Sequence, residues 1–220
     1  DSLAIAAGGL TAGAAVYGGT EADSLVITGN VIGSSLIGDD GAGSSLDGAD
    51  SFVVTGTGFT SSYFSGGSGN DLFSANGLVD ASAIYGGAGD DAFTLGTLTA
   101  TTSVFGGSGN DTFIVANAVN TASLLGEDGS DSISIGNTVS RAYIGGGSGN
   151  DSISFGAALN EATSVLGEAG NDLIVNDSAA GLLSKTYIDG GADNDTMRFM
   201  GGLTSTTLYG GSGNDLFSIG

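Results

Sequence analysis

Hydrophobic residues recur along the chain in short apolar–x–apolar pairs, such as Phe93 with Leu95 and Ile133 with Ile135. Alternation with a period of two is typical of a short β-strand with one buried face. A second apolar position returns once in every repeat, at Val16, Phe64, Ile84, Val104, Leu124, Ile144, Val165, Ile188 and Leu208. The pattern therefore predicts two short strands per repeat, and no segment of ten or more residues has a helical period.

A motif rich in glycine and aspartate lies between the two strand patterns. It reads GGSGNDLF at residues 66–73 and returns as GGAGDDAF at 86–93, GGSGNDTF at 106–113, GGSGNDSI at 146–153 and GGSGNDLF at 210–217, with looser copies at 126–133, 167–174 and 190–197. A motif that returns about every 20 residues is the signature of a solenoid. The sequence predicts an all-β fold, a parallel β-solenoid of about ten turns of about 20 residues.

One domain is expected over residues 1–220. Residues 66–220 hold the regular turns, and residues 1–65 hold degenerate turns whose register is set by Asp1, Asp23 and Asp50. The long interval before Asp50 contains GDDGAGSSLDGAD, which predicts a bulge or small loop. The chain begins and ends at the same phase of the repeat. This phase is expected of a segment of a longer solenoid, or alternatively of copies that stack end to end.

Composition narrows the possible functions. The 220 residues include 43 glycines, no proline, no cysteine and no histidine, and 24 acids oppose three bases for a formal charge of −21. Such a surface repels nucleic acid and anionic membranes but recruits cations. Disulfides and thiolate metal sites are excluded, and no apolar run is long enough to span a bilayer. The carboxylates repeat in equivalent settings, whereas catalytic pairs need unlike ones, so no enzyme is expected.

The repeated corner has the chemistry of a hard-cation site. Glycines at the first, second and fourth places of the motif allow the backbone to turn its carbonyl groups outward, and the sixth-place aspartate adds a carboxylate. Oxygen ligands of this kind suit Ca²⁺, which takes six to eight of them, better than Mg²⁺. Because one corner has too few oxygens, each ion is expected between two turns stacked about 4.8 Å apart.

The GGSGND sequence followed by an apolar position resembles the calcium-binding repeat of the repeats-in-toxin (RTX) proteins, and the resemblance covers residues 66–220. It implies a calcium-dependent β-roll in which carbonyl groups and the aspartate bind Ca²⁺ between turns. The implied carboxylate ligands are Asp71, Asp91, Asp111, Asp131, Asp151, Asp172, Asp195 and Asp215. The implied carbonyl ligands are those of Gly67, Gly69, Gly87, Gly89, Gly107, Gly109, Gly147, Gly149, Gly211 and Gly213.

The chain departs from that family in having one motif per turn instead of two. One row of ions is therefore expected, as in the single-motif solenoids of some bacterial surface adhesins. Eight motifs leave seven gaps, and about seven calcium ions would reduce the formal charge from −21 to about −7. Glu127 and Glu168 replace second-place glycines and Asp193 replaces a fourth-place glycine, so sites at those corners are less regular. The alternative interpretation is that the corners are only turns, but aligned acids would then repel each other.

The leading functional hypothesis is a secreted, calcium-stabilised structural protein of a bacterial cell surface: a subunit or segment of a surface layer, extracellular filament or adhesin stalk. Self-association, end to end or lateral, is the expected partnership, with no nucleic acid and no membrane insertion. The resemblance also links the chain to type I secretion. The alternatives are the calcium-binding tail of a larger secreted hydrolase and an ice-binding or adhesive module. The third motif place is irregular, with Ser68, Ala88 and Asp128 among its residues, and this disfavours ice binding.

A further column of large residues precedes the motif by one position, at Tyr17, Tyr85, Phe105, Leu125, Leu166 and Tyr209. These residues are expected either to widen the core or to form an exposed apolar stripe for lateral packing. The core is the favoured interpretation.

Overall fold

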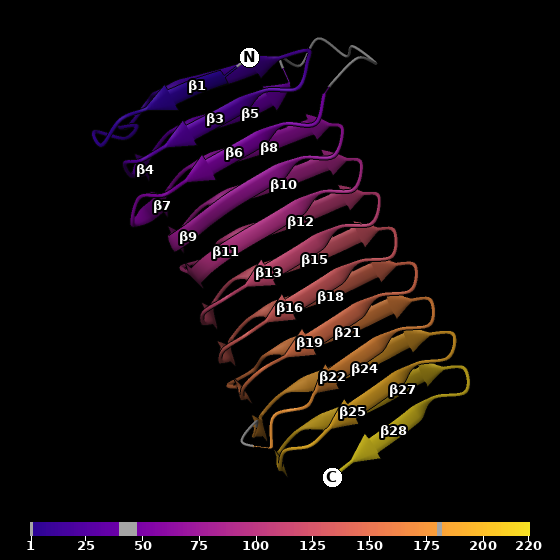
Figure 1. Cartoon of the computed structure of the whole chain (residues 1–220). Coiled ribbons are helices and arrows are strands. Elements are labelled where there is room, and N and C mark those ends of the chain that lie inside the picture. The colour runs from indigo at the N-terminus through magenta and orange to yellow at the C-terminus, as the bar shows by residue number, and fades with distance from the viewer. Residues whose placement is uncertain (1, 40–47, 180–181) are drawn as a thin grey trace.

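The computed structural model describes residues 2–39, 48–179 and 182–220. In these ranges the chain winds into stacked, parallel coils, one above the next from the N-terminal to the C-terminal end (Figure 1). The predicted all-β fold, a parallel β-solenoid of about ten turns of about 20 residues, is confirmed. No helix occurs among the described residues, and so none there is long and apolar enough to cross a membrane. Asp1 and residues 40–47, which hold part of the expected loop, lie outside those ranges.

One sheet consists of the strands that lead into each motif, and it is called here the pre-motif sheet. Every strand pairs in parallel with its equivalent one turn away. In chain order its strands are β2 (Ala15–Gly19), β5 (Ser35–Asp39), β8 (Tyr63–Ser68), β10 (Ala83–Ala88), β12 (Ser103–Ser108), β15 (Ser123–Asp128), β18 (Tyr143–Ser148), β21 (Ser164–Ala169), β24 (Tyr187–Ala192) and β27 (Thr207–Ser212).

The second sheet, the post-motif sheet, begins directly after each motif aspartate. Its first column of strands is β1 (Ser2–Ile5), β3 (Ser24–Ile27), β6 (Ser51–Val54), β9 (Leu72–Asp80), β11 (Ala92–Thr99), β13 (Thr112–Val115), β16 (Ser132–Ile135), β19 (Ser152–Phe155), β22 (Leu173–Asn176), β25 (Thr196–Phe199) and β28 (Leu216–Ile219). Its second column is β4 (Val31–Ile32), β7 (Gly58–Thr60), β14 (Val119–Asn120), β17 (Val139–Ser140), β20 (Leu159–Asn160), β23 (Leu183–Ser184) and β26 (Leu203–Thr204), and β9 and β11 extend into it.

A full turn therefore has three strand segments, and the prediction of two was wrong in this respect. The missed segment carries its own core column, which includes Val79, Leu98, Val119 and Val139, all fully buried. Most of these strands are two residues long, too short to show alternation in the sequence. The post-motif column is also buried, from Phe52 to Phe199, and Phe93 stacks on Phe113 with ring centroids 4.8 Å apart.

The two core columns predicted from the sequence are confirmed, except at the first and last turns, where residues such as Val16 and Leu208 are only partly buried. Ile84, Val104, Leu124 and Ile144 are fully buried. Phe217 and Ile219 are 41% and 55% exposed because they lie on β28, over which no further turn is stacked. Burial in this fold comes from the neighbouring turn, so each turn depends on the next for its core.

The corner opposite the motif is formed without glycine in most turns. Its backbone enters the left-handed region at Ser61, Ala81, Thr101, Thr121, Arg141, Ala162, Lys185 and Ser205. The next residue is often a buried Ser or Thr whose hydroxyl bonds to the backbone, as Ser82 does to the carbonyl of Asp80 at 2.8 Å. Left-handed conformations cost free energy for residues with a Cβ, and stacking in register offsets that cost here.

The column at Tyr17, Tyr85 and Tyr209 does not widen the core, so the favoured interpretation was wrong. These side chains are 62%, 38% and 57% exposed and lie on the outer face of the pre-motif sheet. The residues on either side of them in each strand point inward, so alternation along the strand directs this position outward. Phe105, Leu125 and Leu166 share the column and are half-buried.

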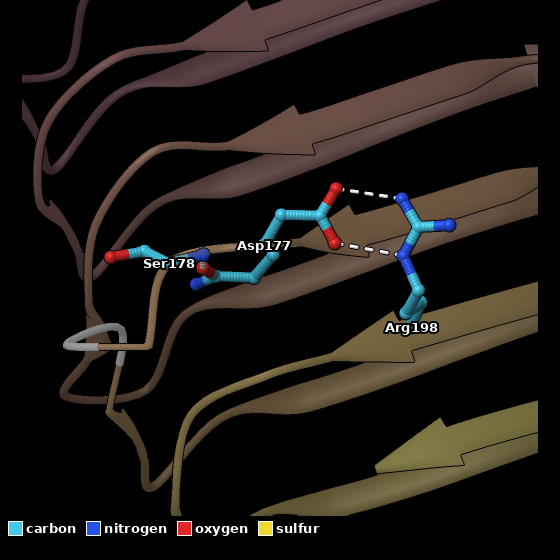
Figure 2. A network of polar contacts seen from close by, with 4 residues as sticks. Asp177, Ser178 and Arg198 are labelled. Atoms are coloured by element: carbon cyan, nitrogen blue, oxygen red, sulfur yellow. Dashed lines mark hydrogen bonds and ion pairs between the residues drawn. The ribbon is translucent and has the colours of Figure 1, made fainter. Parts of the chain in front are cut away.

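Among the residues that the structure describes, Arg141 and Arg198 form ion pairs between neighbouring turns. Arg198 on β25 donates to Asp177, just after β22, through Nε at 2.8 Å and a second guanidinium nitrogen at 2.6 Å (Figure 2). This pairing lowers the pKa of Asp177. Arg141 pairs with Glu161 one turn away through a single hydrogen bond from a guanidinium nitrogen to a carboxylate oxygen. All four side chains are about half exposed or more, and such exposed pairs contribute little to the stability of a fold. With three bases in the chain, most of the 24 acids need another counter-ion.

Candidate metal site

The motif aspartates form a row inside the solenoid, along the corners at the right of Figure 1. Asp91, Asp111, Asp131, Asp151 and Asp195 are 1–2% exposed, and their neighbours in the row are similarly buried as far as Asp50. They are buried because each follows a turn that directs its side chain toward the core. A row of buried carboxylates is costly unless each receives hydrogen bonds or a cation.

One carboxylate oxygen of each aspartate is satisfied by the preceding turn. The backbone N–H of Asp91 donates to Oδ1 of Asp111 at 2.7 Å, and the N–H of Asp111 donates to Oδ1 of Asp131 at the same distance. The bonds of this inner ladder run from Asp23 to Asp215, with lengths between 2.7 and 3.1 Å. Each aspartate thus caps the turn before it.

The second oxygen, Oδ2, lies over the first glycine of its own motif. A Cβ on Gly86 would come within 2.1 Å of Asp91 Oδ2 and within 2.6 Å of the carbonyl oxygen of Gly106, so only glycine fits there. The carboxylate oxygen and the next turn's carbonyl oxygen therefore face the same space. Oδ2 is buried with no hydrogen-bond partner in Asp91, Asp111, Asp131, Asp151, Asp172 and Asp195.

Burial and mutual repulsion change the acidity of these groups. Desolvation, followed by the charges of neighbouring aspartates, raises the pKa of Asp91, Asp131 and Asp172 to about 7. Desolvation likewise raises the pKa of Asp111 to about 6. The backbone N–H that donates to each carboxylate lowers its pKa, but by less than desolvation raises it. The affinity of the row for protons is therefore raised near neutral pH.

A second ladder runs along the outside of the same corners and was missed from the sequence. The fifth-place residue of every motif but the last accepts a hydrogen bond from the backbone of the next turn: the N–H of Asn110 donates to Asp90 Oδ1 at 2.7 Å. Its members are Asn70, Asp90, Asn110, Ser130, Asn150, Asn171, Asn194 and Asn214. Its bonds run in the opposite direction to those of the inner ladder. The recurrence of Asn or Asp at the fifth place of the motif is the sequence feature from which this outer ladder could have been predicted.

The carbonyl groups implied as ligands lie along the stack. The oxygens of Gly67 and Gly87 face the second-place glycine of the next turn, at 2.0 Å from where a Cβ would be. The carbonyl oxygens of the fourth-place residues Gly69, Gly89 and Gly149 face the fourth-place glycine of the next turn. In the space over Gly86, the carbonyl that accompanies Asp91 Oδ2 is therefore the first-place one of Gly106, a position that the sequence did not single out.

These residues fit a hard cation by their chemistry. The donor set of buried carboxylate oxygens and carbonyl oxygens is all oxygen, as Ca²⁺ prefers, and Oδ2 has no other partner in six of the turns. No three acidic side chains converge on one point among the described residues. Any ion would thus be shared between two turns and would rely on carbonyl oxygens.

The degenerate turns before residue 66 share part of this geometry. A Cβ on Gly38 would come within 2.2 Å of both Asp50 Oδ2 and the carbonyl oxygen of Gly66. A Cβ on Gly18 would approach Asp23 Oδ2 and the carbonyl oxygen of Gly38 at 2.7 Å. The carboxylate row therefore extends beyond the eight copies of the motif, although the corners before residue 66 lack the full glycine pattern.

Three motif positions carry a side chain where the repeat has glycine. Glu127, Glu168 and Asp193 have φ of 80°, in the left-handed region. We expect Glu127→Gly to stabilise the fold by about 1 kcal/mol, because it removes this backbone strain. Thermal unfolding at constant calcium measures the effect. Glu127→Gln removes the same charge but keeps the strain, so an equal gain in both variants would show that charge, and not backbone conformation, is responsible.

No family model matches the chain, and no curated protein or solved structure matches it either.

Proposed function

We propose that the chain is an extracellular, calcium-stabilised structural solenoid, a subunit or segment of a bacterial surface layer, filament or adhesin stalk. The observation that carries the proposal is the buried row of motif aspartates, in six of which, from Asp91 to Asp195, the Oδ2 atom has no hydrogen-bond partner. The proposal gives the chain no catalytic role. The resemblance of its motif to RTX repeats supports the choice of calcium and of a secreted protein.

Calcium would act through charge and through folding. When bound between turns it would neutralise carboxylates that otherwise repel each other, in a chain of formal charge −21. The motif residues that would hold it are the aspartates from Asp71 to Asp215, all buried except the half-buried Asp215, with carbonyl groups of the motif glycines. Because the unfolded chain has no such aligned row, the free energy of binding would become free energy of folding.

This mechanism suits a structural role outside the cell. Each turn of the solenoid contacts its neighbours only, so one ion between each pair of turns would strengthen every interface of the rod. The chain would be stiff at the millimolar calcium of extracellular fluids and unfolded where calcium is scarce. The coupling of folding to calcium is thus the property on which the structural role rests.

Small-angle X-ray scattering tests this coupling. In calcium we expect a radius of gyration of about 20 Å, and after chelation at pH 7.5 a value approaching the roughly 50 Å of an unfolded chain of this length. Magnesium should not restore the compact form, because it requires a small octahedral shell and retains its waters. An unchanged scattering profile after chelation, or equal rescue by magnesium, would be evidence against the proposal.

A further inference from the structure

Each copy of the motif has two left-handed backbone positions, its second and fourth places. Thirteen of these sixteen positions hold glycine, and the other three hold Glu127, Glu168 and Asp193. Glutamate is not a residue type that favours a left-handed backbone, as glycine and asparagine do. The opposite corner of the coil has left-handed residues of many kinds, among them Ser61, Ala81, Thr101, Arg141, Glu161 and Lys185. At the motif corner, by contrast, every replacement of glycine is an acid, which indicates that negative charge is needed there.

The two glutamates lie one turn to either side of a regular corner. In the pre-motif sheet Glu127 on β15 pairs with Gly147 on β18, and Gly147 pairs with Glu168 on β21. Both glutamates line one hollow of about 240 Å³ on the outside of that corner. The Glu168 carboxylate lies over Gly145, with an oxygen 3.0 Å from where a Cβ would be. The corner at residues 146–151 is thus flanked by two negative charges.

This hollow adjoins the inner row of aspartates through Gly146. The glycine lines the hollow, and a Cβ on it would come within 2.3 Å of Asp151 Oδ2. That oxygen is buried and has no hydrogen-bond partner. Gly146 therefore borders both the hollow outside and the partnerless oxygen inside, and the glutamate charges act across its backbone.

The charges of the glutamates reach the row. Desolvation is the largest cause of the raised pKa of Asp151, and the charge of Glu168 raises it further. The charge of Glu127 adds to the effect of desolvation on Asp111 in the same direction. A negative charge that makes a proton harder to remove from a carboxylate also makes a cation bind there more tightly.

The glutamates themselves are not placed as ligands. Both side chains are exposed, whereas the motif aspartates from Asp71 to Asp195 are 1–3% exposed. No three acidic side chains converge on one point in the part of the chain that the structure describes. Calcium requires six to eight oxygen ligands, and two exposed carboxylates do not supply them. Their effect on a bound cation is therefore one of charge at a distance.

We propose that Glu127 and Glu168 attract the divalent cation to the gaps on either side of residues 146–151 and raise its affinity there, without binding it. Because both carboxylates are exposed, water and salt weaken this attraction, and together they should raise the affinity about threefold at low ionic strength. The inference rests on the proposed function, since it assumes that the row binds a divalent cation. It adds that the gaps are not equivalent: those beside residues 146–151 fill at lower calcium than those within residues 66–111, where the second and fourth places are all glycine.

Hydrogen exchange of the full chain at a series of calcium concentrations tests the inference, because mass spectrometry of its peptides reports different turns separately. Residues 126–172 should become protected at about threefold lower calcium than residues 66–111, and the difference should shrink at about 0.5 M salt. In Glu127→Gln/Glu168→Gln the two regions should become protected together. Glutamine has the size of glutamate and keeps the left-handed strain, whereas glycine would also relieve it. The salt series on the wild type decides the question even if the double variant fails to fold.

The matched control is Asp80→Asn/Glu161→Gln, which removes two acids from the opposite corner and leaves an acceptor for the Thr99 hydroxyl. It should leave the order of protection unchanged. The calcium-free chain at pH 4.5 should unfold at the same temperature with and without the two glutamates, and a lower midpoint in the glutamine variant would show that they act on the fold and not on the cation.

The outcomes separate this inference from the proposed function. Calcium-dependent protection with one midpoint in both regions, or an equal change in the control variant, would overturn the inference and leave the proposed function standing. Protection that does not depend on calcium would overturn both.

Discussion

Withdrawal of calcium at pH 7.5 is expected to unfold the solenoid, and acidification of the calcium-free chain to pH 4.5 is expected to refold it. The physical reason is the buried row of aspartates. At pH 7.5 these carboxylates are charged, desolvated and close to one another, and the chain offers three bases against 24 acids. Without a cation the repulsion and the lost hydration oppose folding.

The sign of the pH effect follows from the direction of the shifts. Burial raises the pKa of Asp91, Asp131 and Asp172 to about 7 and that of Asp111 to about 6, above the ordinary 3.8. A group whose pKa is raised on folding contributes stability that is full below its unfolded pKa and is lost as the pH rises through its folded pKa. The calcium-free fold should therefore be most stable below about pH 4 and weaken between pH 4 and pH 7.

A protonated aspartate in the row could also form a hydrogen bond that the charged form cannot. A protonated Asp91 could donate from Oδ2 toward the carbonyl oxygen of Gly106, which faces the same space. Circular dichroism in chelator at a series of pH values measures the effect, and the same series in calcium is the control. In calcium the stability should instead decline toward acid pH, where protons displace the ion. Identical pH profiles with and without calcium would contradict this prediction.

Asp111→Ala is expected to be the most damaging single substitution in the row, with a loss of about 3–5 kcal/mol and a fall in the midpoint of thermal unfolding of about 10 °C. Asp111 is 1% exposed and lies in the middle of the inner ladder. Its removal leaves the N–H of Asp91 without its acceptor and removes a carboxylate from two gaps between turns. Thermal unfolding monitored by circular dichroism measures the loss.

Two controls separate the contributions of Asp111. Asp111→Asn keeps the side-chain oxygen for the N–H of Asp91 but removes the charge, so it should lower calcium affinity while preserving the calcium-free fold. Asp90→Asn removes the same charge one residue away, on the exposed outer ladder, and keeps an acceptor for Asn110. It should be nearly neutral. If Asp111→Asn binds calcium as tightly as the wild type, the carboxylate is not a ligand.

The architecture could be predicted from the sequence because the motif repeats in register. The spacing of the motif aspartates indicated the length of the turn. The two hydrophobic columns that include Ile144 and Ile135 indicated two of the three core positions. The third column was not predictable from alternation, since strands such as β17 have two residues. A second corner in each turn is expected from the sequence, but its position could not be predicted, because Thr121 and Arg141 adopt left-handed conformations that are uncommon for their residue types.

The candidate site was predictable in its residues but not in its geometry. The motif placed Asp91 and Asp111 in one column, and the structure stacks them with Oδ2 lacking a partner. The sequence could not show that Oδ1 caps the preceding turn, or that the first-place carbonyl of Gly106 faces Oδ2, because both depend on stacking between turns. Strand alternation alone would have predicted that Tyr85 points outward. The large hydrophobic residues in its column favoured the core instead, and that interpretation was wrong.

The central claim, that the buried aspartates hold calcium, is tested most directly by counting the ions. The protein is dialysed against calcium-free buffer at pH 7.5, its circular dichroism spectrum is recorded, and its bound calcium is measured by mass spectrometry of the element. We predict about seven calcium ions per folded chain, one for each gap between the eight copies of the motif. A chain that keeps its full β spectrum with less than one calcium ion bound would contradict it.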